Sequence, residues 1–200
     1  MALSDLLQQR RAIKQFDPDF KIDEFEFQNL IETAKQTPSS FNIQHWRFVV
    51  VKDKDARQKI RDAAWDQSQV TDASHLVVLC GDIKAWEKNP EQYWTGAPDP
   101  VQEMIVPKIK NFYEGRNWIQ RDEALRSVGL IASTFMLTAI ERGFDTCPMI
   151  GFDQDAVAEI INLPDDHLIG MLLPVGKRAQ EPFSEPGRLA YEHFVIEDKF

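Results

Sequence analysis

Apolar positions recur along this chain with the two periods that distinguish helices from strands. In residues 27–34 they follow the i, i+3, i+4, i+7 spacing of a helix that buries one face. Asp23 and Glu26 stand ahead of that run with the spacing of a capping box, and Pro38 follows it. We therefore predict a helix that begins near Asp23 and ends before Pro38.

The same signals predict further helices elsewhere in the chain. They are a short first helix capped by Ser4, a helix from Asp55 to about Gln67, a long helix with apolar positions between Leu125 and Ile140, and a short helix that starts at Asp153. Gly143 follows the long helix at the position where a left-handed residue commonly ends one.

Short apolar runs predict the strands. Residues 47–52 (RFVVVK) and 168–175 (LIGMLLPV) read as strands, and HFVIED near the C-terminus is a further candidate. Residues 76–80 (LVVLC) are apolar without interruption, which is typical of a strand covered on both faces. Helices and strands alternate without GxGxxG or GxxxxGKS/T, so the usual backbone cradles for dinucleotides and nucleoside triphosphates are missing.

The pattern breaks between Trp86 and Val101. This stretch, WEKNPEQYWTGAPDPV, combines three aromatic residues with three prolines. We interpret it as an excursion from the fold, either a lid over a site or an arm that contacts a partner, rather than as a linker.

Composition indicates one soluble globular domain that spans residues 1–200. Of the 200 residues, 43% are apolar and 28% are charged, which is ordinary for such a chain and enough to bury a core. The net charge of −9 argues against nucleic acid or an anionic membrane as the main partner, because the overall field repels phosphate. Any anion must therefore be met by a local cluster of basic residues.

A few further features limit location and metal content. No apolar run approaches the roughly 20 residues that span a bilayer, and the basic residues of the N-terminal segment come after its apolar ones, unlike those of a signal peptide. Cys80 and Cys147 form no CxxC pair, which fits a reducing cytoplasm without disulfides. The His residues are scattered, without metal-ligand spacing, so a zinc site is not expected.

Arginines near both ends of the chain are candidates for binding an anion. Arg10, Arg11 and Lys14 place three cations within five residues, and Arg188 follows a Pro-Gly turn that would aim its guanidinium inward. Arginine is the planar fork that suits phosphate. A solvated charge run and a surface arginine are the plain alternatives.

Two polar loops stand beside apolar strands. Residues 38–44 (PSSFNIQ) carry a polar side chain at most positions, and residues 147–153 (CPMIGFD) leave the N–H groups of Ile150 and Gly151 free to meet a ligand. Each loop has a structural alternative. The first is explained by Asx and Ser turns, and the second by a strand-to-helix turn that ends at the Asp153 cap.

Five stretches stand in one order along the chain: RRAIKQF at 10–16, PSSFNIQHWRF at 38–48, AWDQSQVTDASHLVVLC at 64–80, CPMIGFD at 147–153, and PVG at 174–176 with the later Arg188. Together they resemble the nitroreductase family of FMN-dependent NAD(P)H oxidoreductases, from about Leu6 to Leu189. The resemblance implies an α+β fold with a central, mostly antiparallel sheet flanked by helices in three layers. It also implies a homodimer that exchanges C-terminal arms and builds two FMN sites at its interface.

The resemblance assigns the FMN contacts residue by residue. Arg10, Arg11 and Arg188 would hold the phosphate, and Lys14 would reach the N1/C2 carbonyl edge, where its charge raises the flavin potential. The other contacts would come from Ala12, from Asp66 and Gln69 at the pyrimidine edge, from Pro148, Met149, Ile150 and Gly151 near N5, and from Pro38, Ser39, Ser40 and Asn42 of the other subunit.

Several of these positions depart from the family pattern. Ala12 replaces a frequent Ser, and Asp66 and Gln69 stand where Asn and often a basic residue are usual, so a cation that would raise the flavin potential is missing. Ile150 replaces a frequent Glu or Gly and makes the pocket beside N5 apolar. Pro186 stands where some relatives carry Lys near the phosphate.

The implied function is hydride transfer from NAD(P)H through FMN to nitroaromatic or quinone acceptors in two alternating half-reactions, with no side chain as an essential acid or base. Phe41, Phe112 and Tyr113 resemble residues that line the open face of the flavin, although isolated aromatics more often serve packing. Two alternatives remain. One is a flavin-dependent reductase or dehydrogenase of a specific metabolite, with the excursion as its lid, and the other is a non-catalytic FMN carrier or sensor.

Overall fold

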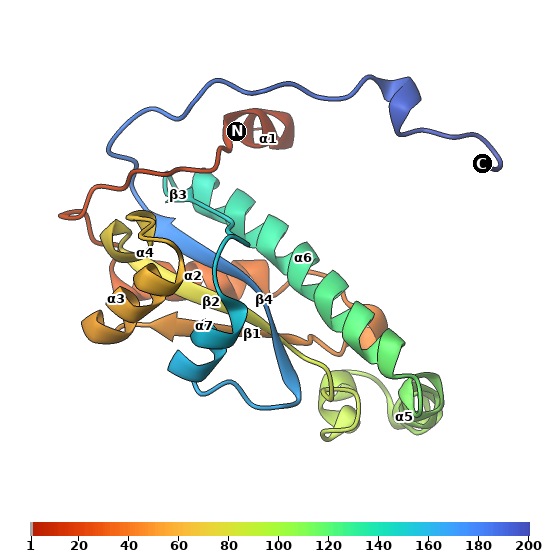
Figure 1. Cartoon of the computed structure of the whole chain (residues 1–200). Coiled ribbons are helices and arrows are strands. Elements are labelled where there is room, and N and C mark those ends of the chain that lie inside the picture. Colours follow the sequence, from red (N-terminus) through yellow and green to blue (C-terminus); the bar gives the residue numbers. More distant parts are fainter. Residues whose placement is uncertain (1) are drawn as a thin grey trace.

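The computed structural model describes residues 2–200 and is built around a four-stranded antiparallel sheet (Figure 1). The strands are β1 (Trp46–Val51), β2 (His75–Asp82), β3 (Asp145–Thr146) and β4 (His167–Gly176), in the spatial order β1-β2-β4-β3. All three neighbouring pairs are antiparallel. The predicted central antiparallel sheet is confirmed.

Strand β2 lies at the centre of the sheet because both of its faces are apolar. Its residues from Leu76 to Asp82 are all buried, as the uninterrupted apolar run predicts. Leu76, Val78 and Cys80 belong to the core on one side, whereas Val77 and Leu79 belong to the core on the other side. Successive side chains of a strand point to opposite faces, so β2 joins two cores.

Helices cover both faces of the sheet and complete three layers (Figure 1). On one face, α3 (Lys54–Ala63), α4 (Gln69–Asp72) and α7 (Gln154–Ile160) contribute Ile60, Val70 and Val157 to the core. On the other, α2 (Glu24–Ala34) and α6 (Asn117–Glu141) contribute residues such as Leu30 and Phe135. The predicted α+β class is confirmed.

Close packing of α6 on the sheet depends on a glycine in β4. A Cβ added to Gly170 would lie 2.3 Å from Val128 Cγ1, which is far inside van der Waals contact. The helix crosses the sheet at this point because position 170 carries no side chain. Gly170→Ala would therefore push α6 away from the sheet.

Helix ends follow the predicted caps in most cases. The Asp23 side chain accepts from the N–H of Glu26 at 2.9 Å, and Asp153 caps α7 in the same way. Gly143 follows α6 with φ of 78°, as expected for a residue that ends a helix. The Ser4 cap is wrong: α1 (Leu3–Gln9) starts earlier, and Asp5 accepts from the N–H of Ala2.

Two other predicted elements differ from the structure. Helix α3 ends at Ala63 and does not reach Gln67, because Trp65 and Asp66 adopt left-handed φ values of 54° and 56°. The HFVIED run forms no strand: Tyr191–His193 is a 3₁₀ turn in an exposed tail with no strand beside it. The excursion is partly helical, with a 3₁₀ helix at Pro90–Trp94 and α5 at Asp99–Tyr113.

Helix α6 is the one helix among residues 2–200 whose length and composition would suffice to cross a membrane, with a mean hydropathy of 1.3 over its most apolar window. Its buried residues include Val128, Ile131 and Phe135, which pack against the sheet. An apolar face of this kind is ordinary for the core helix of a soluble protein. We therefore interpret α6 as a core helix.

Candidate functional site

The basic segment, residues 10–14, runs beside the edge strand β3. The N–H of Ile13 donates to the carbonyl of Thr146 at 3.1 Å, and Ala12 pairs with the same residue in a parallel bridge. Ile13 is buried in the core, whereas Ala12 and Lys14 are exposed on either side of it. The apolar anchor at Ile13 thus fixes a short cationic edge on the surface.

Two of the predicted phosphate ligands, Arg11 and Arg188, meet at one carboxylate. Arg188 Nη2 lies 2.6 Å from Glu185 Oε1, and Arg11 Nη2 lies 3.7 Å from Glu185 Oε2. Arg10 is half-buried and forms no ion pair within residues 2–200. Arginines from the two ends of the sequence therefore converge on an anionic group, which is what a phosphate would require.

The turn that follows α3 holds Asp66 and Gln69 in different settings. Asp66 is exposed, and its Oδ1 accepts from Nε of Arg61 at 2.6 Å. Gln69 is buried, and its Nε2 donates to Oε1 of Gln67 at 3.0 Å. Arg61 supplies a cation beside Asp66, and sequence analysis did not identify it because it lies in the preceding helix.

The segment from Cys147 to Gly151 presents bare backbone donors. Met149 pairs with Leu172 of β4, with N···O distances of 2.9 and 3.0 Å. Beyond this bridge, the N–H groups of Ile150 and Gly151 donate no hydrogen bond within residues 2–200. Ile150 is 78% exposed and Gly151 is half-buried, and their N–H groups have no protein acceptor, as the sequence predicts.

Trp65 lies against this segment. A Cβ added to Gly151 would lie 2.9 Å from Cζ3 of the Trp65 ring, so the backbone here approaches the indole closely. The indole is 70% exposed beside the exposed Ile150. No sequence motif assigns this tryptophan to the site.

The polar loop at residues 38–44 is tied to the excursion. Phe41 and Asn42 adopt left-handed φ values of 50° and 58°. The Asn42 side chain donates to the carbonyl of Tyr93 at 2.7 Å, and the Trp94 indole donates to the carbonyl of Phe41 at 3.0 Å. Left-handed conformations of non-glycine residues persist where surrounding contacts hold them. The excursion thus braces the loop in this conformation.

The rest of this loop follows turn chemistry. The Ser39 hydroxyl accepts from the N–H of Gln44 at 2.9 Å, and the N–H of Asn42 donates to the carbonyl of Ser39 at 3.0 Å. Pro38 is exposed and Ser40 is half-buried. The loop therefore satisfies part of its own polarity, as the alternative reading predicts, while Pro38 and Ser40 stay accessible.

The three aromatic residues predicted to line the open face of the flavin lie close together and form an aromatic wall. The ring centroid of Phe41 lies 5.4 Å from that of Phe112 and 6.2 Å from that of Tyr113. Phe41 and Phe112 are half-buried, whereas Tyr113 is fully buried and stacked on Trp86. Tyr113 therefore supports the wall from behind, and Phe41 and Phe112 form its surface.

We expect the free energy of unfolding to fall as the pH drops below about 6.5. The reason is His45, which directly follows the polar loop at residues 38–44. The ring is fully buried, its Nδ1 lies 3.1 Å from the Ser127 hydroxyl, and its Nε2 has no partner among the described residues. Burial lowers the pKa of His45 to about 4. The unfolded chain therefore takes up a proton at higher pH than the folded one, which costs about 2 kcal/mol of stability by about pH 5.

Urea unfolding of the wild type and His45→Gln at neutral pH and at about pH 5 measures this effect. The wild type should lose more stability than the variant between the two conditions. Equal losses would show that His45 does not control this part of the pH dependence.

The basic segment and the polar loop with its aromatic wall lie at opposite ends of α6 (Figure 1). The basic segment lies beside β3, just after the C-terminal end of α6, whereas Phe112 and Tyr113 precede its N-terminal end. At 1.5 Å per residue, the 25 residues of α6 span roughly 37 Å. A single chain therefore does not bring the basic segment and the polar loop to one ligand.

A cavity beside the basic segment is also small in the single chain. It has a volume of about 110 Å³ and lies between Ala12, Lys14 and the tail residues 180–183. Ordinary cofactor and ligand sites measure roughly 300–1,000 Å³. The cavity beside the basic segment is therefore smaller than such sites.

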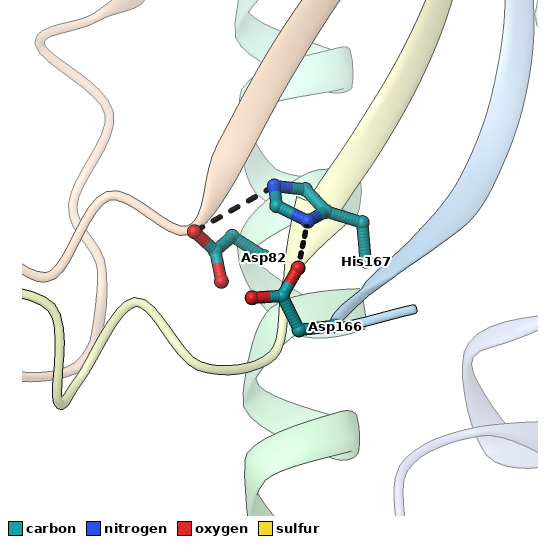
Figure 2. Close-up of side chains that lie close together, drawn as sticks. All are labelled: Asp82, Asp166 and His167. Carbon is teal, nitrogen blue, oxygen red and sulfur yellow. Dashed lines mark hydrogen bonds and ion pairs between the residues drawn. The ribbon is translucent and has the colours of Figure 1, made fainter. Parts of the chain in front are cut away.

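A separate cluster joins Asp82, Asp166 and His167 at the end of the sheet (Figure 2). Their ligand atoms lie within 4.8 Å of one another, a spacing that a metal ion could use. Two cations already meet Asp82, however: Lys88 Nζ and Arg47 Nη2 each lie 3.0 Å from Oδ2. We interpret the cluster as an ion-pair network that fixes the start of the excursion.

Comparison with known proteins matches nearly the whole chain. The model of the Nitroreductase family matches residues 7–177. Protein DrgA of Synechocystis is 44% identical over 190 residues, which cover 92% of this chain and 90% of that protein. Putative NAD(P)H nitroreductase MhqN of Bacillus subtilis is 35% identical over 182 residues, 88% of each chain.

A solved structure agrees with this match. It is the crystal structure of a putative nitroreductase in complex with FMN from Exiguobacterium sibiricum. The two folds superpose with a TM-score of 0.91 at 29% sequence identity, and the match covers 98% of this chain and 97% of the other.

Proposed function

Because this chain belongs to the nitroreductase family, we propose that it is an FMN-dependent oxidoreductase that passes electrons from NAD(P)H to nitroaromatic or quinone acceptors. The observation that carries the proposal is the convergence of Arg11 and Arg188, from opposite ends of the sequence, on one anionic group. The FMN-bound relative of the same fold supports the choice of cofactor.

The residues present fit FMN in two respects. Arg10, Arg11 and Arg188 offer guanidinium groups for a phosphate. The N–H groups of Ile150 and Gly151, which donate no hydrogen bond within residues 2–200, are candidate donors for a ring nitrogen. FMN, when bound, supplies the two-electron chemistry by accepting hydride from NAD(P)H and giving it to the acceptor.

The protein's own part is to bind, orient and exclude water. Lys14 carries a positive charge at the exposed edge of the site, which favours added negative charge on a neighbouring group. Phe41 and Phe112 offer an aromatic surface for flat molecules. NAD(P)H and the acceptor would occupy the same place in turn, and the one proton that the acceptor needs in addition to the hydride would come from water.

The complete site requires a second copy of the chain. The polar loop and the basic segment lie at opposite ends of α6, so the loop of one subunit would complete the site of the other. The tail is the second support: it runs away from the sheet (Figure 1), and its exposed apolar residues are Phe183, Leu189, Tyr191, Phe194, Ile196 and Phe200. Such a tail is suited to docking on a partner.

Residues 1–200 would form one FMN-binding domain in each subunit, and the protein would work in the cytoplasm. The buried, unpaired Cys80 and Cys147 fit a reducing compartment.

Glu185→Gln is expected to strengthen FMN binding about two- to fivefold, because the carboxylate between Arg11 and Arg188 competes with the phosphate. Fluorescence titration of the apoprotein with FMN measures the affinity. Glu32→Gln is the control and should leave FMN binding unchanged, since this exposed carboxylate of α2 pairs with Lys35 and belongs to none of the candidate contacts. Unchanged or weaker FMN binding by Glu185→Gln would contradict the placement of the phosphate.

Anaerobic reduction tests the proposed activity. The purified protein is mixed with NADH or NADPH in a stopped-flow instrument, and the visible flavin absorbance is followed before and after addition of a quinone. Rapid bleaching by at least one nicotinamide and recovery with the quinone are expected. Bound flavin that neither nicotinamide reduces would identify a carrier or sensor, and a colourless protein that does not bind FMN would overturn the proposal.

A further inference from the structure

One side chain, Gln67, links three separate parts of the candidate site. Its Nε2 donates to the carbonyl oxygens of Gly151 at 2.9 Å and Ala64 at 3.1 Å. Its Oε1 accepts from Gln69 Nε2 at 3.0 Å and from Lys14 Nζ at 3.5 Å. Lys14 is 53 residues away along the sequence and Gly151 is 84 residues away.

The orientation of this amide is fixed by its partners. An amide side chain has two N–H donors and one oxygen with two lone pairs, and Gln67 uses all of them. If the amide were flipped, its NH₂ would face the Lys14 ammonium and the Gln69 amide, and its oxygen would face two carbonyl oxygens. All four contacts would then be unfavourable, so Gln67 holds Lys14 and Gly151 at a set spacing.

A neutral partner leaves the charge of Lys14 intact. No carboxylate forms an ion pair with Lys14 among residues 2–200, and the two side chains that its ammonium meets, the Gln67 amide and the Cys147 thiol, are both neutral. A glutamate at position 67 could accept from the same donors, but it would neutralise the ammonium. An amide at position 67 therefore keeps the Lys14 edge of the site positively charged, whereas a carboxylate would cancel that charge.

We propose that Gln67 is a positioning residue that holds Lys14 and the Gly151 backbone in register and keeps the Lys14 charge available to the bound cofactor. The proposal rests on the proposed function, because it requires FMN beside Lys14. On this proposal, Gln67 influences the reduction potential of the bound FMN through its contacts with other protein groups.

The test compares FMN-loaded wild type with Gln67→Glu and Gln67→Met. Gln67→Glu should weaken the binding of reduced FMN relative to oxidised FMN about tenfold, which lowers the two-electron midpoint potential by about 30 mV. Gln67→Met keeps the length of the side chain but removes all of its hydrogen bonds. This variant should raise the Kd for FMN about tenfold. Gln28→Glu makes the same charge change on an exposed helix position and should alter neither quantity.

The outcomes separate this inference from the proposed function. A wild type that binds no FMN overturns the proposed function and this inference with it. A wild type that binds FMN, with Gln67→Glu at the wild-type potential, overturns the inference alone, even if the melting temperature falls, because a purely structural amide would change only stability. If Gln67→Met does not fold, the potential of Gln67→Glu decides.

Discussion

Asp82→Ala is expected to lower the free energy of unfolding by about 3 kcal/mol. The Asp82 side chain, drawn in Figure 2, is 2% exposed. It meets Arg47 and Lys88, each at 3.0 Å, and its Oδ1 accepts from the N–H of Lys84 at 2.9 Å. Removal of the carboxylate leaves these donors without their acceptor. The cost lies at the lower end of the range for a broken buried pair, because the side chains of Arg47 and Lys88 are partly exposed and regain water.

Urea unfolding at one fixed protein concentration measures this change, since an assembled protein gains stability with concentration. Asp166→Asn is the matched control. Asp166 also pairs with Lys88 but is more exposed, so its loss should cost less than about 1 kcal/mol. If Asp82→Ala were as stable as the control, the network would not be the anchor of the excursion.

Arg10→Ala and Arg188→Ala are each expected to weaken FMN binding about 10- to 100-fold. A hydrogen bond to a charged group contributes about 1.5–3 kcal/mol, and about 1.4 kcal/mol corresponds to a tenfold change in Kd. Arg188 is 70% exposed in the single chain, so its removal should leave the stability of the fold unchanged. The hydride step should also keep its rate once the variants are saturated with FMN.

Titration of the apoproteins with FMN at two salt concentrations measures both affinity and its electrostatic part. Arg126→Ala is the control, because this exposed arginine of α6 pairs with Glu123 and lies outside the candidate site. Full flavin occupancy of purified Arg10→Ala at low FMN concentration would show that the phosphate binds elsewhere.

Local signals were enough to predict the elements whose burial and caps lie within one stretch of sequence. The helix after Asp23 has both its cap and its apolar spacing within a few residues. The burial of β2 follows from its unbroken apolar run. In each case the neighbouring residues already determine which face is buried.

Elements in which a residue departs from its usual secondary-structure preference could not be predicted from the sequence. Prolines in the excursion suggested irregular structure, but Pro100 lies near the start of α5, where a missing N–H costs nothing. Pro107 lies inside the same helix at an exposed position. Trp65 follows α3 in a left-handed conformation that tryptophan rarely adopts, whereas Asp66, which shares that conformation, is of a residue type that adopts it more readily.

The residues of the candidate site likewise fall into those that local sequence predicts and those that it does not. Its short motifs were found because each lies within one loop. Gln67 and Glu185 were missed because their partners lie on other segments, and only the folded chain brings them together. Gln67 lies in the sequence between the predicted contacts Asp66 and Gln69, and this neighbourhood was the one sequence feature that could have pointed to it.

Sedimentation velocity followed at the visible flavin absorbance tests the central claim that two copies of the chain enclose FMN. The 23.1 kDa chain should sediment as a species of twice that mass, and the flavin absorbance should move with it in a ratio of one FMN per chain. Flavin that sediments with the single chain, or protein of either mass that carries no flavin after incubation with FMN, would contradict it.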